Sequence, residues 1–145
     1  MKFGKTLVVL SLTLASGLAG ANDKKLVEYR DNGMEILGGH MGSIVAIVKG
    51  EVPYASELAY HADALAAAAP TVLTMFEIEA MSDDSDALPK IWQQWADFEK
   101  AARKLETASA DLAAAVASGE RGAIGAALGE VGKSCKGCHD EFVED

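Results

Sequence analysis

The chain has 145 residues, 22 of them acidic and 13 basic, and half of its residues are apolar. This length suits one domain, which can bury a core without disulfide staples. The formal net charge of −9 excludes nucleic acid as a partner, because a phosphate backbone would be repelled. A multi-span membrane protein is also excluded, since no window of about 18 residues lacks both charge and proline.

The N-terminus has the features of an export signal. Lys2 and Lys5 form a short basic start, an almost unbroken apolar run covers residues 6–15, and Ala19-Gly20-Ala21 fits a signal-peptidase site. An uncleaved anchor helix is the alternative, but the run is short for one and no basic cluster follows it. We expect residues 1–21 to be a cleaved signal peptide and residues 22–145 to be a periplasmic domain with no membrane attachment.

The mature chain shows helical periodicity and no useful period-two alternation. Apolar residues recur at steps of three and four, and proline, glycine or a polar loop separates the segments. Gly119 is a plausible C-terminal cap for the third helix. The expected helices cover 24–49, 54–69, 89–119 and 120 to about 143, with a less regular apolar segment at 71–81. Four helices with short connections predict an all-α, antiparallel four-helix bundle.

The last helix carries Cys135-Lys136-Gly137-Cys138-His139, which is the C-x-x-C-H attachment signature of haem c. On a helix these two cysteines and the histidine share one face, because they lie three and four residues apart. Both thiols can then form thioethers to the haem vinyl groups while the imidazole reaches the iron. The export signal agrees, since haem c is normally attached outside the cytoplasm.

Other uses of the two cysteines are less consistent with the sequence. A redox-active C-x-x-C usually begins a helix in a βαβ setting, whereas this pair lies near the end of a terminal helix. Zinc would need two more ligands, and His40 and His61 lie on different helices without ligand spacing. An iron–sulfur cluster usually needs four thiolates. A structural disulfide would explain neither His139 nor the spacing.

From Asn22 to Asp145 the chain resembles the cytochrome c′ family, the class II c-type cytochromes. The haem motif is shared with many cytochromes, so the order and the flanking residues make the resemblance specific. The matching residues are Tyr29-Arg30 with Met34, Val48-Lys49-Gly50, Pro53-Tyr54, Asp86-Ala87-Leu88-Pro89-Lys90-Ile91-Trp92 and Val131 to Asp140 around the motif.

The resemblance implies roles for individual residues. Cys135 and Cys138 would hold one covalent haem c per chain, and His139 would be the proximal axial ligand. Arg30 matches a position whose guanidinium, in the family, approaches a haem propionate. Asp31 matches the next position, which in relatives also approaches the haem edge. An ordinary surface arginine that pairs with Asp31 or Glu35 is the alternative for Arg30.

Met34 matches the family position that faces the sixth site of the iron. That position usually holds a bulky apolar residue that does not bind, so the iron is five-coordinate and admits small neutral diatomics such as NO or CO. A thioether is also a good axial ligand, as in low-spin relatives. We expect a five-coordinate haem protein for electron transfer or diatomic binding, with a Met34-ligated electron carrier as the alternative.

Two further expectations concern partners and catalysis. Relatives dimerise through their first two helices, and Gly38, Gly39 and Gly42 would let two first helices cross closely, so a homodimer is expected; the redox partner is not identified. An enzyme such as a peroxidase is disfavoured. Peroxide activation needs a distal acid–base group, and Glu35 points about 100° away from Met34 on the helix.

Overall fold

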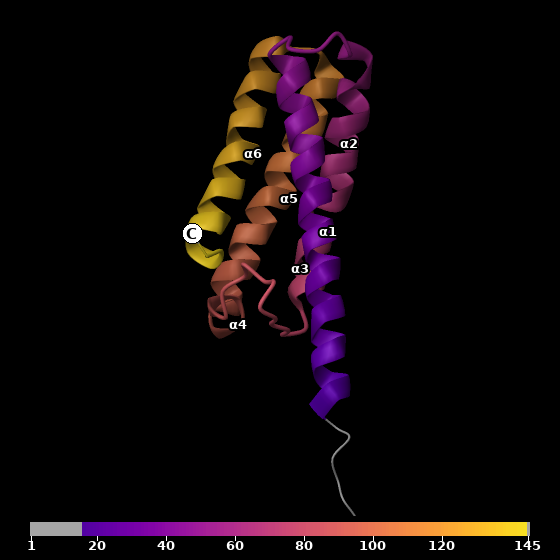
Figure 1. Ribbon diagram of the computed structural model, residues 1–145. Helices are drawn as coiled ribbons and strands as arrows, with labels where there is room; N and C mark the ends of the chain where they lie inside the picture. Colours follow the sequence, from indigo (N-terminus) through magenta and orange to yellow (C-terminus); the bar gives the residue numbers. More distant parts are fainter. Residues whose placement is uncertain (1–15, 145) are drawn as a thin grey trace, which may run out of the picture.

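The computed structural model describes residues 16–144, with side chains from residue 22 onward. Four long helices run alternately up and down and pack side by side (Figure 1). They are α1 (Ser16–Val48), α2 (Leu58–Ala68), α5 (Trp95–Ser118) and α6 (Arg121–Phe142), with the short helices η1 (Ala55–Glu57), α3 (Thr71–Phe76) and α4 (Lys90–Gln93) between them. The predicted all-α, antiparallel four-helix bundle is confirmed.

Some helix boundaries differ from those expected. Helix α1 begins at Ser16 rather than at residue 24, so it includes part of the expected signal peptide, whose residues 1–15 lie outside the described part of the chain. The third expected helix is interrupted at Gln94, where φ is −126° and ψ is 46°. The C-terminal cap at Gly119 is confirmed, because this glycine has the left-handed φ of 73°.

The core takes large side chains from each of the four long helices. Ile44, Leu65, Leu112 and Val131 are each at most 1% exposed. The ring of Phe98 on α5 lies 5.1 Å from that of Phe76, so the core also ties the short helix α3 to the bundle.

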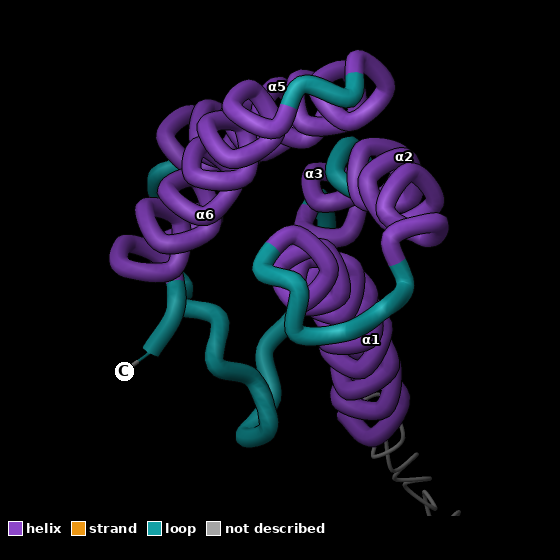
Figure 2. The backbone as a smooth tube through the Cα atoms, turned by 90° about the horizontal axis from the view of Figure 1, so that it is seen from above, coloured by secondary structure: helices purple, strands orange, loops and turns teal. Residues whose placement is uncertain are grey.

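Helix α2 connects two halves of the bundle. It packs against α1 on one side and α5 on the other, while α5 packs along α6 (Figure 2). Among the described helices, α1 and α6 are not a pair in close backbone contact. A ligand can therefore lie between α1 and α6 while the rest of the core stays well packed. Within the described residues, no helix combines the length and apolar character that a bilayer crossing requires.

A glycine at one position of α1 leaves room for a core side chain of α3. A Cβ added to Gly33 would lie 2.1 Å from the sulfur of the buried Met75. At Gly38, Gly39 and Gly42, by contrast, an added Cβ would meet nothing within 4 Å. Within one chain, these three glycines are therefore not needed for helix packing.

We predict that Gly33→Ala destabilises the protein by up to about 1 kcal/mol, because the end of the Met75 side chain must shift within the core. Gly125→Ala on α6 is the control, because an added Cβ there meets nothing within 4 Å, and it should stabilise by up to about 1 kcal/mol through higher helix propensity. Denaturant unfolding of both variants measures the difference. Equal stabilisation by both alanines would contradict the packing described for Gly33.

Candidate haem-binding site

A cavity of about 420 Å³ lies between α1, α5, α6 and the loop before α4. Every site residue predicted from the sequence lines this cavity: Arg30, Asp31 and Met34 from α1, and Cys135, Cys138 and His139 from α6. Most of the remaining wall is apolar and includes Leu37, Met41, Leu65, Val72, Phe76, Ile91, Phe98, Leu105 and Phe142. The fold therefore brings residues about a hundred positions apart to one hollow.

The two cysteines are half-buried, free thiols on the cavity side of α6. Burial raises the pKa of Cys138 to about 11, with the neighbouring Cys135 acting in the same direction. Burial also raises the pKa of Cys135. Both shifts have the same main cause, which is the apolar lining of the cavity on which the two thiols lie.

The end of α6 is held by the loop before α4. The Leu88 amide donates to the Phe142 carbonyl at 2.9 Å, and the Glu144 amide donates to the Asp86 carbonyl at 2.8 Å. Ser85, Asp86 and Ala87 of this loop also line the cavity. Sequence reasoning did not assign them a site role, although Asp86 begins one of the stretches that match the family. The loop thus forms one wall and also restrains the helix that carries His139.

Arg30 is a buried cation, 2% exposed, at the wall of the cavity. Its Nε donates to the Met75 carbonyl at 2.9 Å, Nη1 donates to the Ala80 carbonyl at 2.7 Å, and Nη2 donates to the Ile78 carbonyl. The guanidinium carbon lies 5.0 Å from the ring centroids of both Phe76 and Trp92.

These contacts give Arg30 a structural task that the sequence did not predict. No described carboxylate forms an ion pair with it, so the expected alternative of pairing with Asp31 or Glu35 is wrong. Burial lowers its pKa, while Asp31 and Asp23 act in the opposite direction. A guanidinium has five N–H donors, so contacts with three carbonyls leave donors for a haem propionate. That second role stays a prediction.

The other two α1 residues differ in their exposure. Met34 is partly buried, packs against the core and lines the cavity. Asp31 is exposed, and burial of part of its surface raises the pKa of its carboxyl, with Asp86 and Glu35 acting in the same direction. Asp31 therefore lies at the solvent side of the cavity, among other carboxylates, whereas Met34 lies within its apolar wall.

Val143 follows α6 in an extended conformation, with Ala87 beside it. A cation reaches this end of α6 from another element. Lys90 pairs with Glu141 at 2.7 Å, and its ammonium lies 5.5 Å from the centroid of the Phe142 ring.

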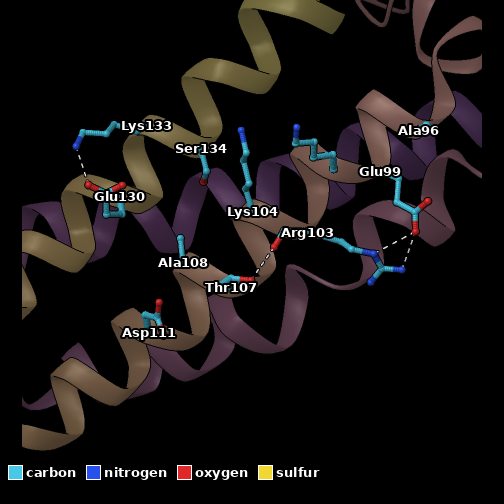
Figure 3. A pocket seen from close by; sticks show the side chains of 11 residues that line it. Ala96, Glu99, Arg103, Lys104, Thr107, Ala108, Asp111, Glu130, Lys133 and Ser134 are labelled. Atoms are coloured by element: carbon cyan, nitrogen blue, oxygen red, sulfur yellow. Dashed lines mark hydrogen bonds and ion pairs between the residues drawn. The ribbon is translucent and has the colours of Figure 1, made fainter.

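A second hollow, of about 850 Å³, lies along α5 and α6 outside the core (Figure 3). Its rim is charged, but many of these charges are already paired. Arg103 lies 2.8 Å from Glu99, and Lys133 lies 2.6 Å from Glu130. It contains neither the histidine nor the cysteines of the motif. The chemistry therefore places the candidate site in the smaller cavity.

A four-helix bundle whose last helix presents C-x-x-C-H to an apolar cavity defines the class of c-type haem proteins. Comparison with known proteins then identifies the family. Residues 25–143 match the family described as Cytochrome C′. Cytochrome c′ of Pararhodospirillum photometricum is 36% identical over 125 residues, which cover 86% of this chain and 100% of the relative.

Solved structures agree with the sequence comparison. Cytochrome c prime from Shewanella frigidimarina has a TM-score of 0.79 at 33% identity, covering 85% of this chain and 97% of the other. A nitric oxide complex of a cytochrome c prime variant from Alcaligenes xylosoxidans has a TM-score of 0.75 at 28% identity, covering 85% and 97%. The chain belongs to the cytochrome c′ family, and its cofactor is covalent haem c.

The residues present fit this cofactor. The cavity is apolar, the two thiols and the imidazole line it from one helix, and Met34 lines it from another. When bound, haem supplies an iron that binds diatomic ligands and changes oxidation state. Attachment by the two thiols, axial ligation by the imidazole and control of access by Met34 stay predictions for these residues.

We predict that Arg30→Met destabilises the protein by about 3 kcal/mol, because two buried carbonyls and one partly buried carbonyl lose their donor. Arg103→Met is the matched control. It removes an exposed pair with Glu99 and should cost less than about 1 kcal/mol. Denaturant unfolding of the haem-loaded protein measures both. Similar losses in the two variants would show that the buried contacts of Arg30 contribute little.

Proposed function

We propose that this protein is an exported, non-enzymatic haem c protein with a five-coordinate iron. His139 is the proximal ligand, and Met34 covers the opposite side without binding. The observation that carries this proposal is that Met34 and the C-x-x-C-H residues line one apolar cavity from facing elements. The function is binding of small neutral diatomics such as NO or CO, electron transfer, or both.

The distal side favours small neutral ligands on physical grounds. Met34 and Leu37 contribute apolar side chains there, and an apolar wall offers no compensation for a desolvated charge. Known relatives support this proposal, since several solved structures with the same fold are nitric oxide complexes of cytochrome c prime variants. Ligation of iron by the Met34 thioether is the alternative, and it would make electron transfer the main function.

The non-enzymatic assignment follows from the placement of carboxylates. Peroxide activation needs an acid–base group beside the open iron site. Glu35 is exposed and does not line the cavity. The two carboxylates that do, Asp31 and Asp86, are exposed to solvent. They therefore belong to the mouth of the cavity, where they lie near the haem edge rather than the iron.

We also propose that the protein is a homodimer through α1 and α2. Tyr29 and Ile36 are seven positions apart on α1 and are 62% and 54% exposed, and Tyr60 on α2 is 62% exposed. Ile47, which is partly buried, lies on the same face of α1 eleven residues after Ile36, about three helical turns. An exposed apolar stripe of this kind is typical of a surface that another chain covers. A second copy fits it, since relatives dimerise through these helices.

Export to the periplasm remains part of the proposal. It rests on the basic and apolar N-terminal residues and on the Ala19-Gly20-Ala21 site. Removal of that segment takes away two of the 13 basic residues and none of the acidic ones. The exported domain would then be more acidic than the full chain, so a basic patch on its redox partner would favour association.

Absorption spectra with and without CO test the role of Met34. The ferrous protein is expected to be high-spin and to bind CO promptly, and Met34→Ala should bind CO at least about tenfold faster, equivalent to a barrier about 1.4 kcal/mol lower. Met41→Ala is the matched control, because Met41 also lines the cavity from α1. It should change the rate little.

A different result would identify the alternative. A low-spin ferrous spectrum that resists CO in the wild type, and becomes high-spin in Met34→Ala, would show that Met34 ligates the iron. The same low-spin spectrum in both proteins would contradict both assignments, because some other residue would then occupy the sixth site.

The dimer is tested by placing a charge in the exposed stripe. Ile36→Glu should raise the dimer dissociation constant at least about a hundredfold, because the interface would have to bury a carboxylate. Ile78→Glu is the control, since Ile78 is 60% exposed but lies outside α1 and α2. Sedimentation velocity measures both. A wild-type monomer, or equal dissociation of both variants, would contradict the proposed interface.

A further inference from the structure

Two histidines outside the haem cavity lie in direct contact. The Nδ1 atoms of His40 on α1 and His61 on α2 are 3.0 Å apart. Their ring centroids are 5.3 Å apart with an interplanar angle of 57°. From the sequence, a zinc site with these two histidines was disfavoured, because they lie on different helices without ligand spacing. The packing of α1 against α2 brings them together.

The backbone on both sides of this pair is anchored in the core. His40 precedes Met41, which packs against the core and lines the haem cavity. His61 precedes the fully buried Ala62 and lies one turn before the buried Leu65. The Tyr60 ring packs against both imidazoles, with centroids 5.9 Å and 5.1 Å away. The two rings are therefore held in place: within one chain both histidines are half-buried, and they border the α1–α2 face proposed as the dimer interface.

The separation of the two nitrogens matches a bidentate metal site. With the two Nδ1 atoms 3.0 Å apart, an ion bound about 2.05 Å from each would have an N–metal–N angle of roughly 94°. That angle is close to the right angle between neighbouring ligands in square-planar or tetragonal coordination, and below the angle of a tetrahedral zinc site. Imidazole nitrogens in this geometry suit Cu²⁺ and Ni²⁺, with Cu²⁺ bound more tightly.

We propose that His40 and His61 form a bidentate site for a late first-row divalent cation, with Cu²⁺ preferred. No described group of three or more His, Cys, Asp or Glu side chains is arranged to hold a metal, so water completes the coordination. In the metal-free pair one ring donates its Nδ1 proton to the other. On binding, that proton moves to Nε2 of the same ring, so both Nδ1 lone pairs reach the cation.

Binding at this site would link two helices that form the haem cavity. The cation would bridge α1, which carries Met34 and Met41, to α2, which carries Leu65. Because the two imidazoles lie together only in the folded chain, the cation would bind the folded state in preference to the unfolded one and stabilise it. The proposal does not depend on the coordination of the haem iron.

The test uses ferric, haem-loaded protein without an affinity tag, titrated with Cu²⁺. The ferric state prevents reduction of copper by the haem. We expect one Cu²⁺ per chain, with electron paramagnetic resonance coupling to two imidazole nitrogens and a raised melting temperature. His61→Phe and His40→Phe keep a ring but remove the donor. Each should weaken binding about a hundredfold, which is the low end of the gain from a second tethered ligand.

Asp63→Asn is the matched control, because Asp63 is exposed on α2 two residues from His61 and so points to another side of the helix. It should bind Cu²⁺ as the wild type does. The Soret absorption of each variant verifies that haem and fold are intact. Equal Cu²⁺ affinity in the wild type and both phenylalanine variants would overturn the proposal, since the copper would then be bound elsewhere, for example at the amino terminus. Coupling to a single nitrogen in the wild type would overturn it as well.

Discussion

The buried guanidinium of Arg30 is the contact on which the shape of the haem site depends. A buried charge is costly unless its donors are satisfied, and here three backbone carbonyls and two aromatic faces surround it. Those carbonyls belong to residues 75–80, which comprise the end of α3 and the chain directly after it. The cation therefore determines where the chain runs between α3 and α4, and with it the position of Phe76 in the cavity wall.

Two halves of the bundle meet at this cavity. Helix α6, packed along α5, carries the two cysteines and the histidine of the C-x-x-C-H motif, whereas α1 carries Arg30 and Met34. Because α2 packs between α1 and α5, the distance between Met34 on α1 and the C-x-x-C-H motif on α6 depends on contacts far from that motif. The same α1–α2 contact brings His40 to His61. Haem chemistry and the proposed copper site thus share one structural element.

Much of the fold could be predicted because helix periodicity and capping are local properties. The apolar steps of three and four located the long helices, and the left-handed Gly119 ended one of them as expected. The break at Gln94 was not predicted, since no proline or glycine marks it. Just before the break, Trp92 donates its indole N–H to the Phe76 carbonyl at 2.8 Å. That partner lies sixteen residues away, beyond the range of local patterns.

The sequence by itself determined the chemistry of attachment, because Cys135, Cys138 and His139 share a face of any helix that contains them. It also indicated which face of α1 is apolar, and hence that Met34 points inward. Only the tertiary structure decided what those residues meet. The partners of Arg30 are 45 to 50 residues away, and His40 and His61 are 21 apart. Contacts across such separations depend on the register between packed helices, which arises from the whole core and from no single segment.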